Sequence, residues 1–192
     1  MRALRLTLVC CGITQGMRKA GFPLDEPLED RSIALARSLK AHLARADRAM
    51  VAPARRARQT AELLGLEAEL CDVLADQDYG RWAGKTPQEV EAEEPGALAA
   101  WRADAGFCPG GGDSLASVAQ RATEFLAQMR EAEGHVIAVT HAAVIRAAIA
   151  RVLQAPAAAS WNIDVPPLSL TDLRSDGTRW ALRAHGVEPG RG

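Results

Sequence analysis

The stretch "HVIAVTHAAVIRAAI", residues 135–149, decides the fold class. Its first part, 135–140, is a short apolar run rich in β-branched residues, which is typical of a strand buried at the centre of a sheet. From Ala142 onwards the pattern is that of a helix, which we expect to reach Leu153. A buried strand that passes directly into a helix is the building unit of an α/β protein.

The same alternation continues on both sides of this stretch. We expect further strands at residues 2–9, 48–52, 67–73, 162–165, 168–173 and 179–184, with a hairpin turn at 175–177. We expect further helices at residues 28–46, 53–64, 87–94, 96–104 and 114–133, and a loop at 12–23. Strands that alternate with helices predict an α/β fold with a mostly parallel sheet covered on both faces.

The length of 192 residues fits one domain, 1–192. Within it, residues 76–113 are rich in glycine and proline, and we interpret them as an excursion that covers one face of the domain. We expect this segment to set substrate choice. Tyr79, Arg81 and Trp82 either line the mouth of a pocket there or only anchor the excursion.

Composition excludes several classes of function. The net charge is -1 and aromatic residues make up only 4% of the chain, which argues against a nucleic-acid partner. No apolar run approaches the ~20 residues that a membrane span needs, and the N-terminus lacks the pattern of a signal peptide. We therefore expect a cytoplasmic protein whose four cysteines are mostly free thiols.

The ends of the predicted strands carry reactive side chains. In parallel sheets, ligands bind outside the carboxyl ends of the strands. This rule selects Cys10 and Cys11 after the first strand, Arg56 after the second, and His141 after the central one. An anion bound at the start of the helix at 53–64 would stabilise the positive charge of an arginine there. We expect Arg56 to bind this anion and the neighbouring arginines to extend into solvent.

Five stretches of the chain resemble the histidine phosphatase superfamily, in its phosphoglycerate-mutase-like branch. They are "LTLVCCGIT", "APARRARQTAELL", "DQDYGRWAGKT", "PGGGDSLASVAQRA" and "VTHAAVIRAAI", and they span most of the chain from Leu4 to about Leu153. The resemblance implies a three-layer αβα sandwich with the site at the strand ends. It also implies phosphoryl-transfer chemistry, with no cofactor and no metal.

The resemblance assigns roles to residues, and the first motif departs from it. The family has Arg-His-Gly after its first strand, where the histidine becomes a phosphohistidine and the arginine clamps the phosphoryl oxygens. Here those positions hold Cys10 and Cys11, followed by a matching Gly12 and Thr14, while Met17 replaces an expected asparagine. The usual nucleophile and one clamp are therefore absent.

The remaining motifs are largely kept. Arg56 falls on the second phosphate-clamping arginine, and His141 falls on the second histidine that contacts the phosphoryl group. Asp76 stands where the family has an acidic proton donor, most often glutamate, and Ser114 matches the serine after the glycine-rich motif. Ser114 is also a plausible N-cap of the helix that follows it.

This site has only some of the family's catalytic residues, and three interpretations of it stay open. The first is a protein that binds inorganic phosphate or a small phosphorylated molecule but has lost phosphohistidine catalysis. The second is an active phosphatase with Cys11 as nucleophile, its thiol pKa lowered by Arg56 or His141. The third is a metal or redox site built from cysteine and histidine, with Asp76 as a further ligand.

In each case, both cysteines are also plausible as small fillers of a pocket that no longer does chemistry. The sequence does not identify a ligand. An Ala-rich apolar chain with an edge strand is compatible with a homodimer.

Overall fold

A six-stranded sheet runs through the centre of the chain in a computed structural model that describes residues 3–188. Its strands are β1 (Leu4–Cys10), β2 (Arg48–Val51), β3 (Ala68–Leu70), β4 (Gly134–Thr140), β5 (Leu170–Ser175) and β6 (Trp180–Val187). Their spatial order is β3-β2-β4-β1-β5-β6. The first four are parallel, whereas β5 and β6 are antiparallel to their neighbours. A mostly parallel sheet was predicted, and the order places the stretch at 135–140 in its middle.

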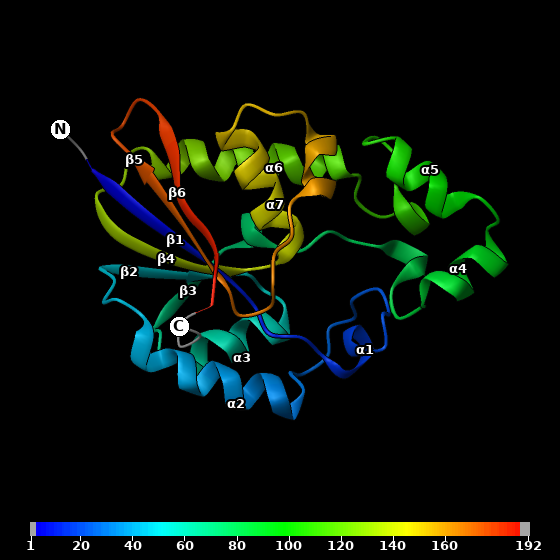
Figure 1. The fold of residues 1–192 in the computed structure, drawn as a ribbon, viewed down its shortest axis with the longest axis horizontal. Coiled ribbons are helices and arrows are strands. Elements are labelled where there is room, and N and C mark those ends of the chain that lie inside the picture. The colour runs from blue at the N-terminus through cyan, green and yellow to red at the C-terminus, as the bar shows by residue number, and fades with distance from the viewer. Residues whose placement is uncertain (1–2, 189–192) are drawn as a thin grey trace.

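Helices cover both faces of this sheet, which gives the predicted three layers (Figure 1). The helices are α1 (Gln15–Arg18), α2 (Asp30–Leu39), α3 (Arg55–Leu63), α4 (Pro87–Glu93), α5 (Ala97–Ala103), α6 (Leu115–Met129) and α7 (Ala142–Val152). α2 and α3 lie on one face, and α6 and α7 lie together on the other. Within residues 3–188, no helix combines the length and the hydrophobicity that crossing a membrane requires.

The core forms where these layers meet. Val136–Val139 of β4 are almost completely buried, because a central strand has helices on both faces. Phe125 of α6 and Ile145 of α7 are likewise buried and belong to the same hydrophobic core. Burying each such large apolar side chain stabilises the fold by about 1.5–3 kcal/mol. This packing holds the carboxyl ends of the parallel strands in a fixed arrangement.

Residues 76–113 lie beyond those carboxyl ends, where α4 and α5 form a separate lobe of the ribbon (Figure 1). Short 3-10 helices accompany them at Gly80–Trp82 and Pro109–Gly111. The two backbone segments touch so closely that a Cβ on Gly112 would lie 2.2 Å from the Asp78 carbonyl oxygen. Only glycine permits this approach, which explains the glycine-rich run.

Several predicted boundaries were wrong. The strand expected at 162–165 is absent: a 3-10 helix, Ala157–Asn162, ends there, and β1 already has β4 and β5 as neighbours. Val165 still packs into the core, so its hydrophobicity reflects burial without strand pairing. The helix expected at 28–46 begins at Asp30 and ends at Leu39, followed by the 3-10 helix Lys40–His42. The first strand starts at Leu4, and Arg2 lies outside the described residues.

Candidate functional site

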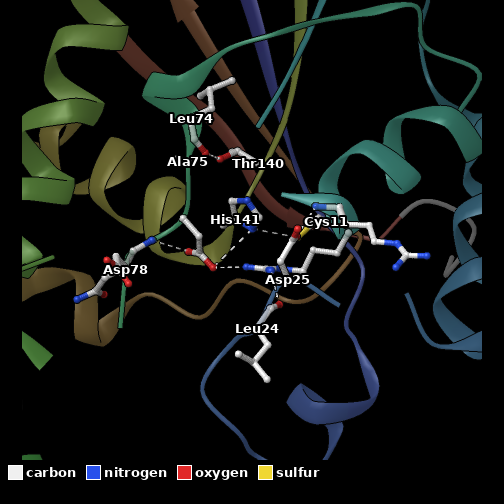
Figure 2. A network of polar contacts seen from close by, with 12 residues as sticks. Cys11, Leu24, Asp25, Leu74, Ala75, Asp78, Thr140 and His141 are labelled. Carbon is white, nitrogen blue, oxygen red and sulfur yellow. Dashed lines mark hydrogen bonds and ion pairs between the residues drawn. The ribbon is translucent and has the colours of Figure 1, made fainter. Parts of the chain in front are cut away.

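Four side chains predicted from the sequence meet at the carboxyl ends of β1 and β4. Because β1 and β4 are parallel and Cys10 pairs with Thr140, the next residues, Cys11 and His141, stand side by side. The Thr140 hydroxyl donates to the Leu74 carbonyl (2.7 Å) and so ties the segment that leads to Asp76 to the same place. Figure 2 shows this network, with Cys11 and His141 facing each other. Arg56 enters from the first turn of α3.

Arg56 is engaged by acceptors from two other segments. Its Nη2 donates to Asp76 Oδ2 at 2.5 Å, and its Nη1 donates to the Leu24 carbonyl at 3.1 Å. The guanidinium is only 3% exposed. Burial is the largest single effect and opposes its charge, yet Asp76 and Cys11 together outweigh burial and raise the pKa of Arg56. A carboxylate of this chain therefore occupies the position on Arg56 that a phosphoryl oxygen would need.

His141 is neutral. Burial lowers the pKa of its imidazole to about 4, although the Asp76 carboxylate acts in the opposite direction. Its Nδ1 lies 3.3 Å from Cys11 Sγ and 3.6 Å from Asp76 Oδ2. The second distance is too long for a hydrogen bond, so the Cys11 thiol is the partner of Nδ1.

The tautomer of that histidine is coupled to its contact with Cys11. Burial raises the pKa of the Cys11 thiol to about 12, more than the charge of Arg56 lowers it. The thiol is thus protonated near neutral pH, and where it donates to His141 Nδ1, the proton of the neutral ring lies on Nε2. Within residues 3–188, His141 Nε2 and Arg56 Nε are buried and have no hydrogen-bond partner. Two unused donors therefore lie within this centre.

Cys10 stands at the same strand end but is held by the backbone. Its N–H donates to the Ser169 carbonyl and its carbonyl accepts from Leu168 N–H, both at 3.0 Å. Burial raises the pKa of its thiol well above the ordinary value. Across residues 3–188, no three histidine, cysteine or acidic side chains are arranged to hold a metal ion, so the metal interpretation gains no geometric support.

Gly12 and Thr14 shape the loop that follows the two cysteines. The Gly12 N–H donates to Thr60 Oγ1 of α3 at 3.1 Å, and a Cβ on Gly12 would lie 2.9 Å from side-chain carbons of Leu28 and Ser32. Thr14 is fully buried and caps α1 by accepting from Met17 N–H. These two residues therefore anchor the loop to α3 and start a short helix that the sequence did not predict.

Ser114 caps a helix, and the other arginines of α3 face solvent. The Ser114 hydroxyl accepts from Ser117 N–H at 3.1 Å, which confirms the predicted N-cap. In the described part of the chain, its hydrogen bonds do not reach Arg56 or His141. Arg55 and Arg58 are exposed, as predicted.

Two arginines of the site were missed from the sequence. Arg121 of α6 donates to the Ala75 carbonyl at 2.7 Å, to the Asp76 carbonyl at 3.2 Å and to Asp113 Oδ2 at 2.7 Å. Arg146 of α7 donates to the Ile163 carbonyl at 2.9 Å and is the charge that lowers the pKa of Cys10. Arg121 stands about two helical turns after Ser114, so the helical period alone suggests that both face the same side.

Comparisons with known proteins identify the family to which this sequence and fold are similar. The sequence profile of the histidine phosphatase superfamily (branch 1) matches residues 6–188. Glucosyl-3-phosphoglycerate phosphatase of Mycobacterium tuberculosis is 34% identical over 118 residues, 54% of this chain and 53% of that protein. The match thus spans about half the length of that relative. The same enzyme of Mycolicibacterium vanbaalenii is 32% identical over 174 residues, 81% of this chain and 77% of the relative.

Solved structures match over nearly the whole chain. A mycobacterial glucosyl-3-phosphoglycerate phosphatase in complex with VO3 superimposes with a TM-score of 0.86 at 28% identity, covering 97% of this chain and 100% of the other. Its complex with inorganic phosphate gives a TM-score of 0.79 at 27% identity, covering 98% of both chains.

Proposed function

The chain belongs to the histidine phosphatase superfamily, and we propose that it binds inorganic phosphate or a small phosphate ester without performing phosphohistidine catalysis. One observation carries the proposal. Arg56 and His141 match the family's phosphate-binding residues, and they lie together with a protonated Cys11, which does not match. The first two residues bind anions, whereas the third stands in place of the nucleophile.

Unused hydrogen-bonding capacity supports the binding half of this proposal. Buried polar atoms without partners cost about 1–3 kcal/mol each, and an anion that accepts from His141 Nε2 and Arg56 Nε would recover part of that cost. Structures of a similar phosphatase hold VO3 or phosphate. The residues that we propose for the anion are Cys10, Gly12, Thr14, Arg56, Ser114 and His141.

Asp76 acts as a competitor of the anion in this proposal. Its Oδ2 already contacts Arg56, and its Oδ1 accepts from Gln77 N–H at 2.9 Å. A phosphate that binds Arg56 must displace the carboxylate or approach it against like-charge repulsion. The anion affinity is therefore lower than that of an open arginine pocket, and it depends on how freely Asp76 moves aside.

Two replacements support the loss of catalysis. Phosphate-monoester hydrolysis is among the slowest uncatalysed reactions, and removing one member of a catalytic unit can cost on the order of a million-fold in rate. Cys11 offers a protonated thiol where the resemblance puts the attacking imidazole, and Cys10 offers no positive charge. A protonated thiol is a poor nucleophile, and an uncharged Cys10 does not clamp phosphoryl oxygens as an arginine does.

Thermal unfolding with phosphate or vanadate tests binding. We expect either anion to raise the melting temperature, and Arg56→Ala to abolish the rise because it removes the clamp. Arg58→Ala, an exposed arginine of the same helix, is the matched control and should keep the rise. Asp76→Asn should enlarge the rise, because it removes the competing charge. An unchanged melting temperature of the parent protein would overturn the binding proposal.

Restoring the first motif tests the loss of catalysis. The double variant Cys10→Arg with Cys11→His should hydrolyse an aryl phosphate that the parent protein leaves intact. Adding Arg56→Ala to this variant should remove the gained turnover. Rapid hydrolysis by the parent protein would contradict the proposal, and a folded but inactive double variant would show that more than the first motif has been lost.

A second candidate function is a phosphatase with Cys11 as nucleophile. The 3.3 Å contact between Cys11 Sγ and His141 Nδ1 favours it, because the histidine is placed to accept the thiol proton. The raised pKa of Cys11 opposes it, since only the thiolate is a good nucleophile. Aryl phosphate turnover by the parent protein that disappears in Cys11→Ser would establish this function instead.

A further inference from the structure

Aromatic side chains are concentrated at one end of this molecule. The chain has four tryptophans, one tyrosine and three phenylalanines, and all except Phe125 and Trp180 gather beyond the strand ends. We call these residues the aromatic cluster: Phe22, Tyr79, Trp82, Trp101, Phe107 and Trp161. Such a concentration in a chain that is poor in aromatic residues suggests a specific use.

Trp101 holds the aromatic cluster together. Its ring centroid lies 4.7 Å from that of Trp161, 5.6 Å from Phe22 and 5.8 Å from Trp82, all in edge-to-face contact. Trp82 is fully buried, so it anchors the excursion and does not line a pocket mouth. Trp161, by contrast, is 37% exposed and therefore presents ring surface to a ligand.

A hollow of about 650 Å³ opens beside these rings. Its lining includes Met17, Phe22, Pro87, Trp101 and Trp161, which are all apolar, together with the guanidinium of Arg102. A volume of this size accommodates a small organic group. Few of the lining side chains are hydrogen-bonding groups of the kind that a sugar requires, whereas indole rings favour a flat, aromatic partner.

This hollow shares two tryptophans with a second, smaller one that lies toward the Arg56 centre. The smaller hollow, about 50 Å³, is lined by Gln77, Ala143 and Arg146 and shares Trp101 and Trp161 with the larger one. Gln77 directly follows Asp76, and Ala143 stands in the first turn of the helix that His141 begins. Trp101 and Trp161 thus border both hollows. Tyr79, which contacts Phe22, connects them to the Arg56 centre: burial raises the pKa of its phenol most, and the charges of Asp76 and Arg56 also act on it.

The loop from α1 makes a second connection. Phe22 lines the large hollow, and Leu24 of the same segment accepts a hydrogen bond from Arg56 through its carbonyl. Trp161 stands in the 3-10 helix Ala157–Asn162, close to Ile163, whose carbonyl holds Arg146. The segment of Phe22 therefore holds Arg56, and the segment of Trp161 holds Arg146, so both rings stand on segments that contact an arginine of the site.

We propose that the large hollow receives an aromatic ring carried by the phosphate ester whose phosphoryl group binds at Arg56. This inference rests on the proposed function and names its ligand class: an ester of phosphate with an aromatic or similarly flat alcohol. Trp161 and Trp101 form the ring site, and Arg102 lies at its exposed edge. There the guanidinium can contact the face of the bound ring or a second anionic group of the ligand.

Titration of the full-length protein with four probes tests this proposal. They are 2-naphthyl phosphate, glycerol phosphate, inorganic phosphate and 2-naphthol, each followed by calorimetry in the parent protein and in two variants. We expect 2-naphthyl phosphate to bind about tenfold tighter than glycerol phosphate. Trp161→Ala should remove that advantage and leave the affinity for inorganic phosphate unchanged. Trp180→Phe, which changes a tryptophan outside the aromatic cluster, should bind all four probes as the parent does.

The outcomes separate this proposal from the phosphate function. If inorganic phosphate binds but 2-naphthyl phosphate binds no tighter than glycerol phosphate, the ring site is overturned and the phosphate function stands. If 2-naphthol binds through Trp161 while inorganic phosphate has no effect, the phosphate function is overturned, and with it the link between the two sites. Dimerisation that Trp161→Ala abolishes, without binding of any naphthyl probe, would assign the hollow to a second copy of this chain.

Discussion

The charges in the centre around Arg56 neutralise each other. One guanidinium faces one carboxylate, Asp76, while burial keeps Cys11 and His141 uncharged. A buried charge without a partner is costly, so the pairing is what permits Arg56 to remain in the interior. Because of this pairing, an anion that binds Arg56 takes the place of the Asp76 carboxylate. The proposed binding depends on this exchange.

The buried imidazole predicts a loss of stability in acid. The pKa of His141 falls from the ordinary 6.5 to about 4, so between these values the unfolded chain binds a proton that the folded chain does not. Stability is therefore fully present above pH 6.5 and declines as the pH falls toward 4, by about 3 kcal/mol from this group.

Urea unfolding at several pH values between 7 and 4.5 measures this decline. We expect His141→Asn to flatten it, because the titrating group is gone, and His42→Asn, which changes an exposed histidine, to leave it unchanged. An equally steep decline in the His141→Asn variant would assign the effect to other groups.

Helix ends at the site depend on specific caps. α6 starts at Ser114, whose hydroxyl satisfies the Ser117 N–H, whereas α3 starts after Ala54, which has no side chain for this purpose. In α3 the exposed Arg55 N–H is instead satisfied by Asp25 Oδ1 at 2.6 Å. The element that carries Arg56 is thus capped by the loop that also carries Leu24, and the loop and the helix position each other.

Replacing the cap of α6 should weaken the fold measurably. We expect Ser114→Ala to lower the free energy of unfolding by about 1 kcal/mol, and Ser114→Asp to retain most of it because aspartate is also a good N-cap. Urea denaturation provides the measurement, with Ser38→Ala, an exposed serine in the last turn of α2, as a control that changes little. A neutral Ser114→Ala would show that the hydroxyl contributes nothing to the helix. A smaller phosphate-induced rise in that variant would place the hydroxyl on the anion as well.

The two ends of the excursion 76–113 are joined at a junction of polar contacts. Arg121 binds both of its ends, through the Ala75 and Asp76 carbonyls at one and Asp113 at the other. Gln77 reinforces this closure by donating to the Asp113 carbonyl at 2.9 Å. This junction therefore acts together with Phe22, which pairs by backbone with Gly84 and Lys85, to orient the lobe formed by α4 and α5 over the strand ends (Figure 1).

Loss of the junction should loosen the lobe before the whole fold. We expect Arg121→Met to speed proteolytic cleavage within 76–113 severalfold under native conditions, because local opening becomes easier than global unfolding. Mass spectrometry of the early fragments identifies the cleavage sites. Gln120→Met, at an exposed neighbouring position on α6, should cleave at the parental rate. Equal rates in both variants would show that the aromatic cluster alone holds the lobe.

Sequence periodicity predicted the layers and the strand ends because it reflects local rules. The stretch at 135–149 contains a strand period and then a helix period, and the carboxyl end of that strand places His141 without reference to any other part of the chain. The same rule placed Cys11 beside it, since neighbouring parallel strands end together. The strand predicted at 162–165 failed because an apolar pattern reports burial, and strand pairing also requires a free sheet edge.

Tertiary structure alone decided the state of the site. The contact between Asp76 and Arg56, the hydrogen bond between Cys11 and His141 and the bond from Arg121 to the Ala75 carbonyl all join residues far apart in sequence. Such contacts follow from how the layers pack, and no local pattern encodes them. Packing also removes water, which is why the thiol of Cys11 and the imidazole of His141 are both neutral in the fold, although the sequence left their charges open.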